Sequence, residues 1–264
     1  MIGELARQEG IKLFSQKYPY LLAALVIVVE AAYMIVTAMK PAETSLDVVT
    51  APQLWAQGLG WGLRFEVYAI LVIGGMGISR EFSLGTVKTV LILPIRRYQW
   101  ILAKLLGLVL LSWSLLIVVV GLGLVIAAIS PGWGDVLRDG VRLYTAGQVW
   151  GNLALASGLT FVFMLPVCAF ALLISSFFSS SGAAVGVTLL LGIVLETVTE
   201  MLDLGTWLFI HHLYRPFAMI EKLGKGLPFR WGETAAWGST VALVTFVIFA
   251  GLLIFRMGRV DITD

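Results

Sequence analysis

The chain has 264 residues, of which 59% are hydrophobic and 13% are charged, and its mean hydropathy is +0.95. Soluble domains are about 45–50% apolar and about 25% charged, so this composition excludes an ordinary soluble fold and favours a protein surrounded by lipid. A net charge of +2, with no basic stretch interleaved with aromatic residues, argues against nucleic-acid binding. The single cysteine, Cys168, excludes an internal disulfide and a cysteine metal cluster.

Six apolar runs, taken in chain order, are candidates to cross a bilayer. A transmembrane helix needs about 20 predominantly apolar residues to span the hydrocarbon core. The runs cover residues 20–39, 61–78, 105–129, 153–174, 183–198 and 236–255. The sequence therefore predicts an all-α membrane protein, with six transmembrane helices in a single permease-like domain over residues 1–264. Pro166 predicts a kink in the fourth span.

The distribution of basic residues predicts which side of the membrane each loop occupies, because short cytoplasmic loops carry an excess of Lys and Arg. Residues 79–104, between the second and third spans, contain five basic residues and one acid. The N-terminal segment and the C-terminal tail are also basic, although the loop before the last span is basic as well. Six spans place both termini on one side, and we expect that side to be the cytoplasm of a prokaryotic cell membrane.

The first 19 residues predict a helix that lies along the membrane surface. Leu5, Ile11 and Phe14 are apolar residues scattered among charges, a pattern typical of an amphipathic helix at the interface. The alternative is a disordered tail, which is common at chain termini.

The segment SREFSLGTVKTVLILPIRRYQWILAK, residues 79–104, is longer than a simple loop between two spans. Gly85 is expected to end the helix that arrives from the second span, and Thr86 is a good N-cap for the apolar run that follows. Pro94 ends that run, because proline interrupts the helical hydrogen-bond ladder. The pattern predicts a compact helical elbow whose apolar side chains are poorly covered by lipid, and such a surface favours a protein partner.

This segment resembles the E-x-x-x-G-T-x-x-x-x-L-x-x-P-x-x-R pattern that follows the second span of ABC-2 type transporter permeases. The matching positions are Glu81, Gly85, Thr86, Leu91, Pro94 and Arg97, with Lys104 at the start of the third span. A second piece, AFALLISSFFSSSGAAVGVTLLL at residues 169–191, is similar to the Ser-rich turn between the fourth and fifth spans of that family. With the six-span plan, the resemblance covers nearly the whole chain.

The resemblance implies that residues 85–97 form a coupling helix that docks on a separate ATPase subunit. Glu81 would tie this elbow to the N-terminal helix or to the ATPase, and Arg96 and Arg97 would pair with acidic groups of the ATPase. The alternative for both arginines is a purely topological role, since positive-inside residues need no partner. The resemblance further implies short re-entrant helices at the outer face within residues 199–235.

The energy for transport would have to come from another chain. The sequence contains no glycine-rich phosphate loop of the G-x-x-x-x-G-K-[ST] kind, so we expect no ATP binding, no catalytic residue and no cofactor in this chain. The resemblance implies that ATP and Mg²⁺ are bound by the partner ATPase. It also implies an exporter whose path lies between two permease copies, or between this chain and a paralogue.

Polar residues within the spans are functional candidates, because ionisable groups are costly in the membrane. Glu30, in the middle of the first span, is a candidate to line the translocation path and face the other permease half; the alternative is packing against a neighbouring helix. Arg64 and Glu66 lie near the expected start of the second span, where long side chains can reach the interface. Five glycines predict close helix contacts: Gly74, Gly75, Gly77, Gly121 and Gly123.

Two other functions remain open. A membrane-embedded enzyme, such as a lipid-modifying transferase or a hydrolase, would need a cluster of acids or a metal set at one depth, and the acids here are scattered. His211 and His212 are adjacent and would point in different directions on a helix, so no metal site is expected there. A secondary transporter would show inverted repeats and broken helices, and no repeat between the halves is visible.

Permeases of this pattern carry drugs, peptides, lipid-linked sugars or ions, and no residue favours one cargo.

Overall fold

The computed structural model describes residues 2–39, 50–86, 96–128, 133–138, 141–201 and 205–259. Over these ranges the chain is mostly helical, and six helices are long and apolar enough to cross a membrane, as expected for a multi-pass membrane protein. They are α2 (Lys17–Ala38), α3 (Ala51–Gly77) continued by α4 (Ser79–Ser83), α6 (Arg97–Ala127), α7 (Ala146–Ser175), α8 (Ser181–Met201) and α11 (Gly238–Arg259). The prediction of six spans is confirmed, although α3 begins well before the predicted second span.

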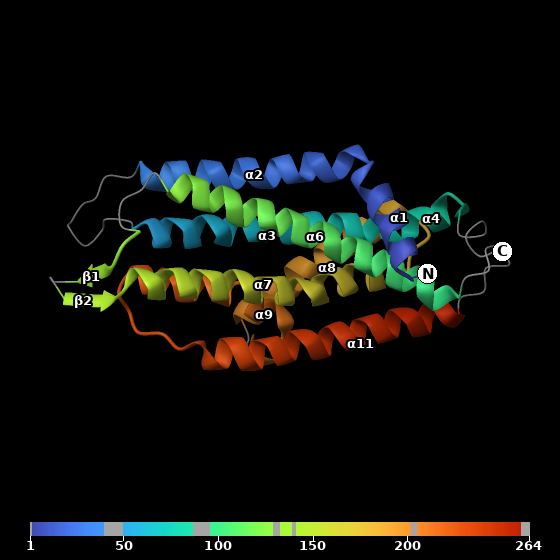
Figure 1. Ribbon diagram of the computed structural model, residues 1–264. Coiled ribbons are helices and arrows are strands. Elements are labelled where there is room, and N and C mark those ends of the chain that lie inside the picture. The colour runs from blue at the N-terminus through green and yellow to red at the C-terminus, as the bar shows by residue number, and fades with distance from the viewer. Residues whose placement is uncertain are drawn as a thin grey trace.

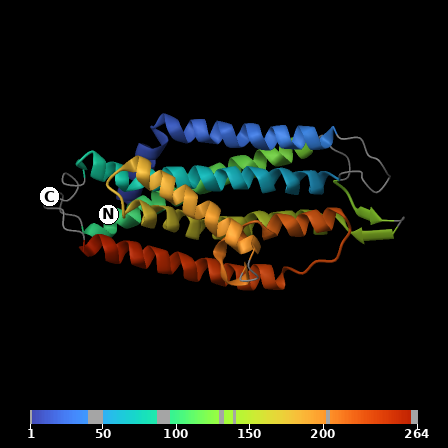
Figure 2. The ribbon, with the colours of Figure 1, turned by 180° about the vertical axis from the view of Figure 1, so that it is seen from behind.

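The long helices run alongside one another in an elongated bundle (Figures 1 and 2). At one end lie α1 (Ile2–Phe14), α4 and the end of α11, and we call this the α4 end. At the opposite end, here called the hairpin end, lie two short strands, β1 (Val136–Arg138) and β2 (Val141–Tyr144). The start and the finish of the described chain therefore lie at the same end, as an even number of spans requires.

The centre of the bundle is formed by α3 and α7, which are buried over most of their length. Small residues allow this close packing: a Cβ added at Gly74 would lie 2.5 Å from the Ala171 Cβ of α7, and one at Gly75 would lie 3.2 Å from the Thr188 hydroxyl of α8. Close contacts at these glycines agree with the sequence prediction. The close helix contact predicted at Gly121 on α6 is absent, because a Cβ added there would meet no atom within 4 Å.

The outer helices α2, α8 and α11 expose apolar side chains along much of their length. Leu21 and Val28 on α2, Leu190 on α8 and Val247 on α11 are among them. Soluble monomers rarely expose extended apolar surfaces, so these faces are suited to lipid or to another protein in the membrane.

The hairpin of β1 and β2 was not predicted, and it corrects the all-α expectation locally. The strands pair antiparallel, with Val136 opposite Tyr144 and an irregularity after Val136. Branched and aromatic residues favour this extended backbone over helix. Asp135 fastens the hairpin to α7, because its carboxylate accepts hydrogen bonds from the Ala146 backbone N–H (2.8 Å) and from Arg142 Nη1 (3.2 Å). Those two bonds hold the pKa of Asp135 below its usual value.

Between α8 and α11 the described residues form four short helical elements. They are a 3₁₀ turn (Gly205–Trp207), α9 (Phe209–Leu213), α10 (Arg215–Gly224) and a π-helical turn (Glu233–Trp237) that leads into α11. Pro216 is the second residue of α10, in the first turn, where its missing N–H has no helical partner to lose. α9 packs between α7 and α11 (Figure 1). α10 packs on α3. Short helices are thus present in the predicted region, and their re-entrant character stays a prediction.

Candidate functional site

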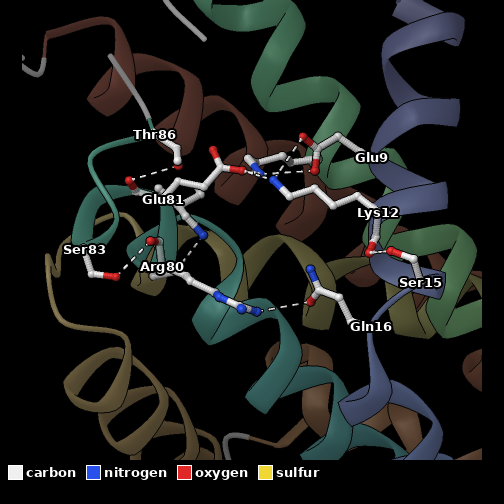
Figure 3. Close-up of polar contacts among 11 residues, drawn as sticks. Glu9, Lys12, Ser15, Gln16, Arg80, Glu81, Ser83 and Thr86 are labelled. Carbon is white, nitrogen blue, oxygen red and sulfur yellow. Dashed lines mark hydrogen bonds and ion pairs between the residues drawn. The ribbon is translucent and has the colours of Figure 1, made fainter. Parts of the chain in front are cut away.

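Glu81 on α4 lies at the centre of an ion cluster that joins three helices. Its Oε1 accepts hydrogen bonds from Lys12 Nζ of α1 at 2.5 Å and from Lys104 Nζ of α6 at 2.6 Å. Lys104 Nζ also donates to Glu9 Oε2 of α1 at 3.2 Å. Figure 3 shows Glu9 and Lys12 reaching from α1 toward Glu81. We call Glu9, Lys12, Glu81 and Lys104 the Glu81 cluster.

A close approach between α1 and α6 brings the cluster together. A Cβ added at Gly107 would lie 3.4 Å from the Glu9 Cβ and 3.6 Å from the Gly10 backbone nitrogen, which is ordinary van der Waals contact and shows that the two helices pack closely here. Lys104 precedes Gly107 by about one turn of α6, which points its side chain to the same face. The packing of α1 on α6 therefore places Glu9 and Lys104 within contact.

The break between α3 and α4 is fixed by Ser175 at the end of α7. The Ser175 hydroxyl accepts hydrogen bonds from the backbone N–H groups of Ile78 (3.1 Å) and Ser79 (3.0 Å), and it donates to the Gly75 carbonyl at 2.6 Å. These bonds satisfy backbone groups that the change of helix direction would otherwise leave unpaired. Sequence reasoning missed Ser175, although it lies in the Ser-rich piece that carries part of the family resemblance.

Burial makes the Glu81 cluster a strong structural link. Glu81 is 5% exposed and Lys104 is 6% exposed, so each charge depends on the other for stabilisation. Glu81 Oε2 has no hydrogen-bond partner among the described residues, but a cavity of about 50 Å³ lies beside the carboxylate. That space is enough for a few waters. At half-buried Lys12, burial lowers the pKa, yet the hydrogen bond and charge of Glu81 outweigh it, so the pKa of Lys12 is raised.

The elbow predicted after Glu81 is described only at its two ends. Gly85 adopts a φ of +67° and ends the helix, as predicted, because glycine tolerates this left-handed conformation. The Thr86 hydroxyl donates to the Glu81 carbonyl at 3.4 Å. Leu91 and Pro94 lie outside the described residues, so the predicted short helix and its docking stay predictions.

The two arginines at the far end of the elbow lie in different environments. Arg96 is exposed and precedes α6, where its backbone N–H donates to Gln99 Oε1 at 3.1 Å. Arg97 Nη1 donates to the carbonyls of Met257 (3.5 Å) and Gly258 (3.4 Å) near the end of α11. A cation at a helix C-terminus is favourable, so Arg97 has a role within the chain besides any contact with a partner.

Glu30 and Glu66 form a second group, deep within the bundle, that we call the carboxyl pair. Glu30 on α2 is fully buried. Its carboxyl group packs closely against two glycines: a Cβ added at Gly62 of α3 would lie 3.1 Å from the Glu30 Cδ, and one added at Gly123 of α6 would lie 2.8 Å from the Glu30 Oε1. Glu66 follows Gly62 by about one turn of α3 and is also fully buried. None of the four carboxyl oxygens has a hydrogen-bond partner in the described part of the chain.

The position of Glu66 corrects the sequence interpretation. Glu66 was expected near the start of the second span, with access to the interface. Because α3 begins at Ala51, Glu66 lies in mid-helix and cannot reach the surface. Glu30 faces α3 and α6 of its own chain, and its predicted contact with a second permease copy stays a prediction. Arg64 pairs with Glu196 of α8 at 3.2 Å.

The two adjacent histidines lie in α9. His212 Nε2 contacts the Thr206 carbonyl at 3.0 Å, and the two rings meet edge to face at 5.4 Å. Burial, followed by the nearby Arg215, lowers the pKa of His211. Burial also lowers the pKa of His212 and outweighs the hydrogen bond with the Thr206 carbonyl, which acts in the opposite direction. Within the described ranges, no group of three or more His, Cys, Asp or Glu residues is placed to hold a metal ion.

Two comparisons with known proteins cover most of the chain. The family described as "Protein of unknown function (DUF2705)" matches residues 13–263. The "Uncharacterized protein YhcI" of Bacillus subtilis (strain 168) is 26% identical over 191 residues, which cover 69% of this chain and 60% of that protein. Neither description states an activity.

Proposed function

This chain belongs to the DUF2705 family, whose function is unknown, and we propose that it is the membrane-spanning permease subunit of an ATP-driven ABC transporter. It works as an exporter, and two permease copies, or this chain and a paralogue, enclose the path. The energy comes from a separate ATPase that binds ATP and Mg²⁺. In this proposal the α4 end faces the cytoplasm of the cell, α1 lies along the inner membrane surface, and α9 and α10 re-enter from the outer face.

The observation that carries the proposal is the Glu81 cluster. It fastens the base of the elbow to α1 through Lys12 and to α6 through Lys104, while Ser175 fastens the same turn to α7. A partner that pulls on the elbow would therefore act on four helices together rather than on a flexible loop. Such a rigid connection is what the transfer of movement from a soluble ATPase to a membrane domain requires.

A second candidate, a secondary transporter, is favoured by the carboxyl pair. Buried carboxyl groups without partners in a membrane bundle are found along proton and ion pathways. Under this alternative, transport would be driven by an ion gradient through Glu30 and Glu66 and would need no ATPase. The two proposals differ in a measurable way, since only the first requires a nucleotide-binding partner.

The test is to tag the C-terminus, solubilise native membranes gently and identify the co-purifying proteins by mass spectrometry. We expect a soluble ATPase with a phosphate-binding loop. Gly85→Val, which strains the left-handed turn, and Arg97→Ala should reduce its recovery at least fivefold while the permease still inserts. Arg142→Ala, a similar loss of charge at the hairpin end, should leave recovery unchanged. If cross-linking at the elbow captures no ATPase, the permease proposal is wrong.

A further inference from the structure

A pocket of about 310 Å³ opens between α2, α3 and α10 in the hairpin half of the bundle. Its walls are aromatic, formed by Tyr33, Trp61, Tyr214 and Phe217, and charged side chains lie at two levels. Tyr33 and Trp61 contact each other with ring centroids 5.5 Å apart. Neither the Glu81 cluster nor the carboxyl pair contributes to this pocket, so it is a separate feature of the molecule.

The deeper level carries a positive charge. The Arg64 guanidinium lies 5.7 Å from the Trp61 ring centroid and 5.3 Å from that of Tyr214, and its Nε is 3.2 Å from Glu196 Oε1. These contacts hold the guanidinium in place, while 37% of the side chain stays exposed. A fixed, planar guanidinium matches the oxygens of a phosphate group well.

The outer level carries a negative charge. Glu221 of α10 lines the pocket and contacts Lys225 Nζ at 2.6 Å and Gln57 Nε2 at 3.4 Å. Gln57 and Arg64 are separated by about two turns of α3, so the two charged levels are about 10 Å apart along the helix. Along the axis of α3, Glu221 lies nearer the hairpin end and Arg64 lies nearer the centre of the bundle, with aromatic faces between the two charges.

We propose that this pocket binds the headgroup of a zwitterionic phospholipid of the phosphatidylethanolamine class. The phosphate contacts Arg64, and the ammonium group lies against the aromatic faces and Glu221. This order of charges matches a lipid in the leaflet at the hairpin end, because its ammonium group lies farther from the bilayer centre than its phosphate. The acyl chains run along α2, which exposes Leu25 and Val28. The proposal is independent of ATP-driven transport.

Gly60 provides a clean way to fill the pocket. It lines the pocket, and a Cβ at this position would meet no atom within 4 Å, so the side chain of Gly60→Leu would start in open space and add apolar bulk to the pocket. Gly121→Leu is the matched control, because Gly121 on α6 is equally open and does not line the pocket. Glu221→Gln tests the charge order, since it removes the negative charge and keeps the size of the side chain; it also breaks the ion pair with Lys225.

The experiment measures phospholipid binding to the purified full chain in detergent, by native mass spectrometry and by thermal-shift titration. Phosphatidylethanolamine should bind the parent chain and Gly121→Leu equally, and at least tenfold more weakly to Gly60→Leu. Glu221→Gln should reduce the preference for phosphatidylethanolamine over anionic phosphatidylglycerol at least threefold. Equal binding to the parent and Gly60→Leu would overturn the proposal, as would an equal affinity of the parent chain for both lipids or occupation by detergent alone.

Discussion

The Glu81 cluster and the carboxyl pair both bury acidic side chains, yet they differ in their partners. Glu81 shares one oxygen between two lysine ammonium groups, at 2.5 and 2.6 Å. Glu30 and Glu66 are at least as well buried, and none of their carboxyl oxygens has a hydrogen-bond partner among the described residues; those of Glu30 lie against Gly62 and Gly123. The first arrangement depends most on Glu81, because its removal leaves the buried Lys104 without its main partner.

The second arrangement has a different physical consequence. A carboxylate in an apolar bundle is stable only when neutral or when paired with a cation, because the cost of burying an isolated charge is large. The carboxyl pair therefore contributes little to holding the helices together. The Glu81 cluster is thus a structural link at the α4 end, whereas the carboxyl pair is buried within the bundle and forms no such link among the described residues.

Glu81→Ala is expected to have the largest effect on stability. It leaves Lys104 buried without its main partner, and the free energy of unfolding should fall by about 3–5 kcal/mol. Thermal unfolding in detergent measures the loss, with Glu4→Ala as the control, since Glu4 belongs to an exposed ion pair with Arg7. Combining Glu81→Leu with Lys104→Met should recover most of the stability. A loss no larger than that of the Glu4 control would show that the cluster is not a structural link.

Lys12 should have a smaller and pH-dependent effect, because half of its side chain is exposed. Its pKa is raised in the folded chain, so its stabilisation is present below the ordinary pKa of 10.5 and is lost as the pH rises through the raised value. Lys12→Gln should cost about 1 kcal/mol at neutral pH, as expected for a partly exposed ion pair. The variant should also lose less stability than the parent as the pH rises above about 10.5. Parallel alkaline curves for both proteins would contradict this prediction.

Glu30→Gln should have the smallest effect on stability. The substitution keeps the size of the side chain and removes no ion pair, so the free energy of unfolding should change by less than about 1 kcal/mol. Glu66→Gln is the matched variant, and transport in membrane vesicles is the second measurement. If the pair serves function, both variants fold normally and transport falls at least tenfold. A stability loss as large as that of Glu81→Ala would mean that the pair is a structural link after all.

Local sequence patterns predicted much of the fold. The six spans follow from runs of apolar residues. The end of the helix of the second span follows from Gly85, whose φ of +67° suits glycine. Both are local properties, because hydropathy and backbone preference depend on a few neighbouring residues. Glu81 was singled out through the family resemblance. Its possible attachment to the N-terminal helix was one of two alternatives, and that contact is present.

Other features could be decided only by the packing of helices that are distant in sequence. Lys12 and Glu81 are separated by 69 residues, so no local pattern pairs them. The burial of Glu66 depends on where α3 begins relative to α2 and α6, and the β1–β2 hairpin depends on Asp135 and Ala146. The sequence determined which segments are helical and apolar; tertiary packing decided which charges meet, because that depends on the relative depth and rotation of neighbouring helices.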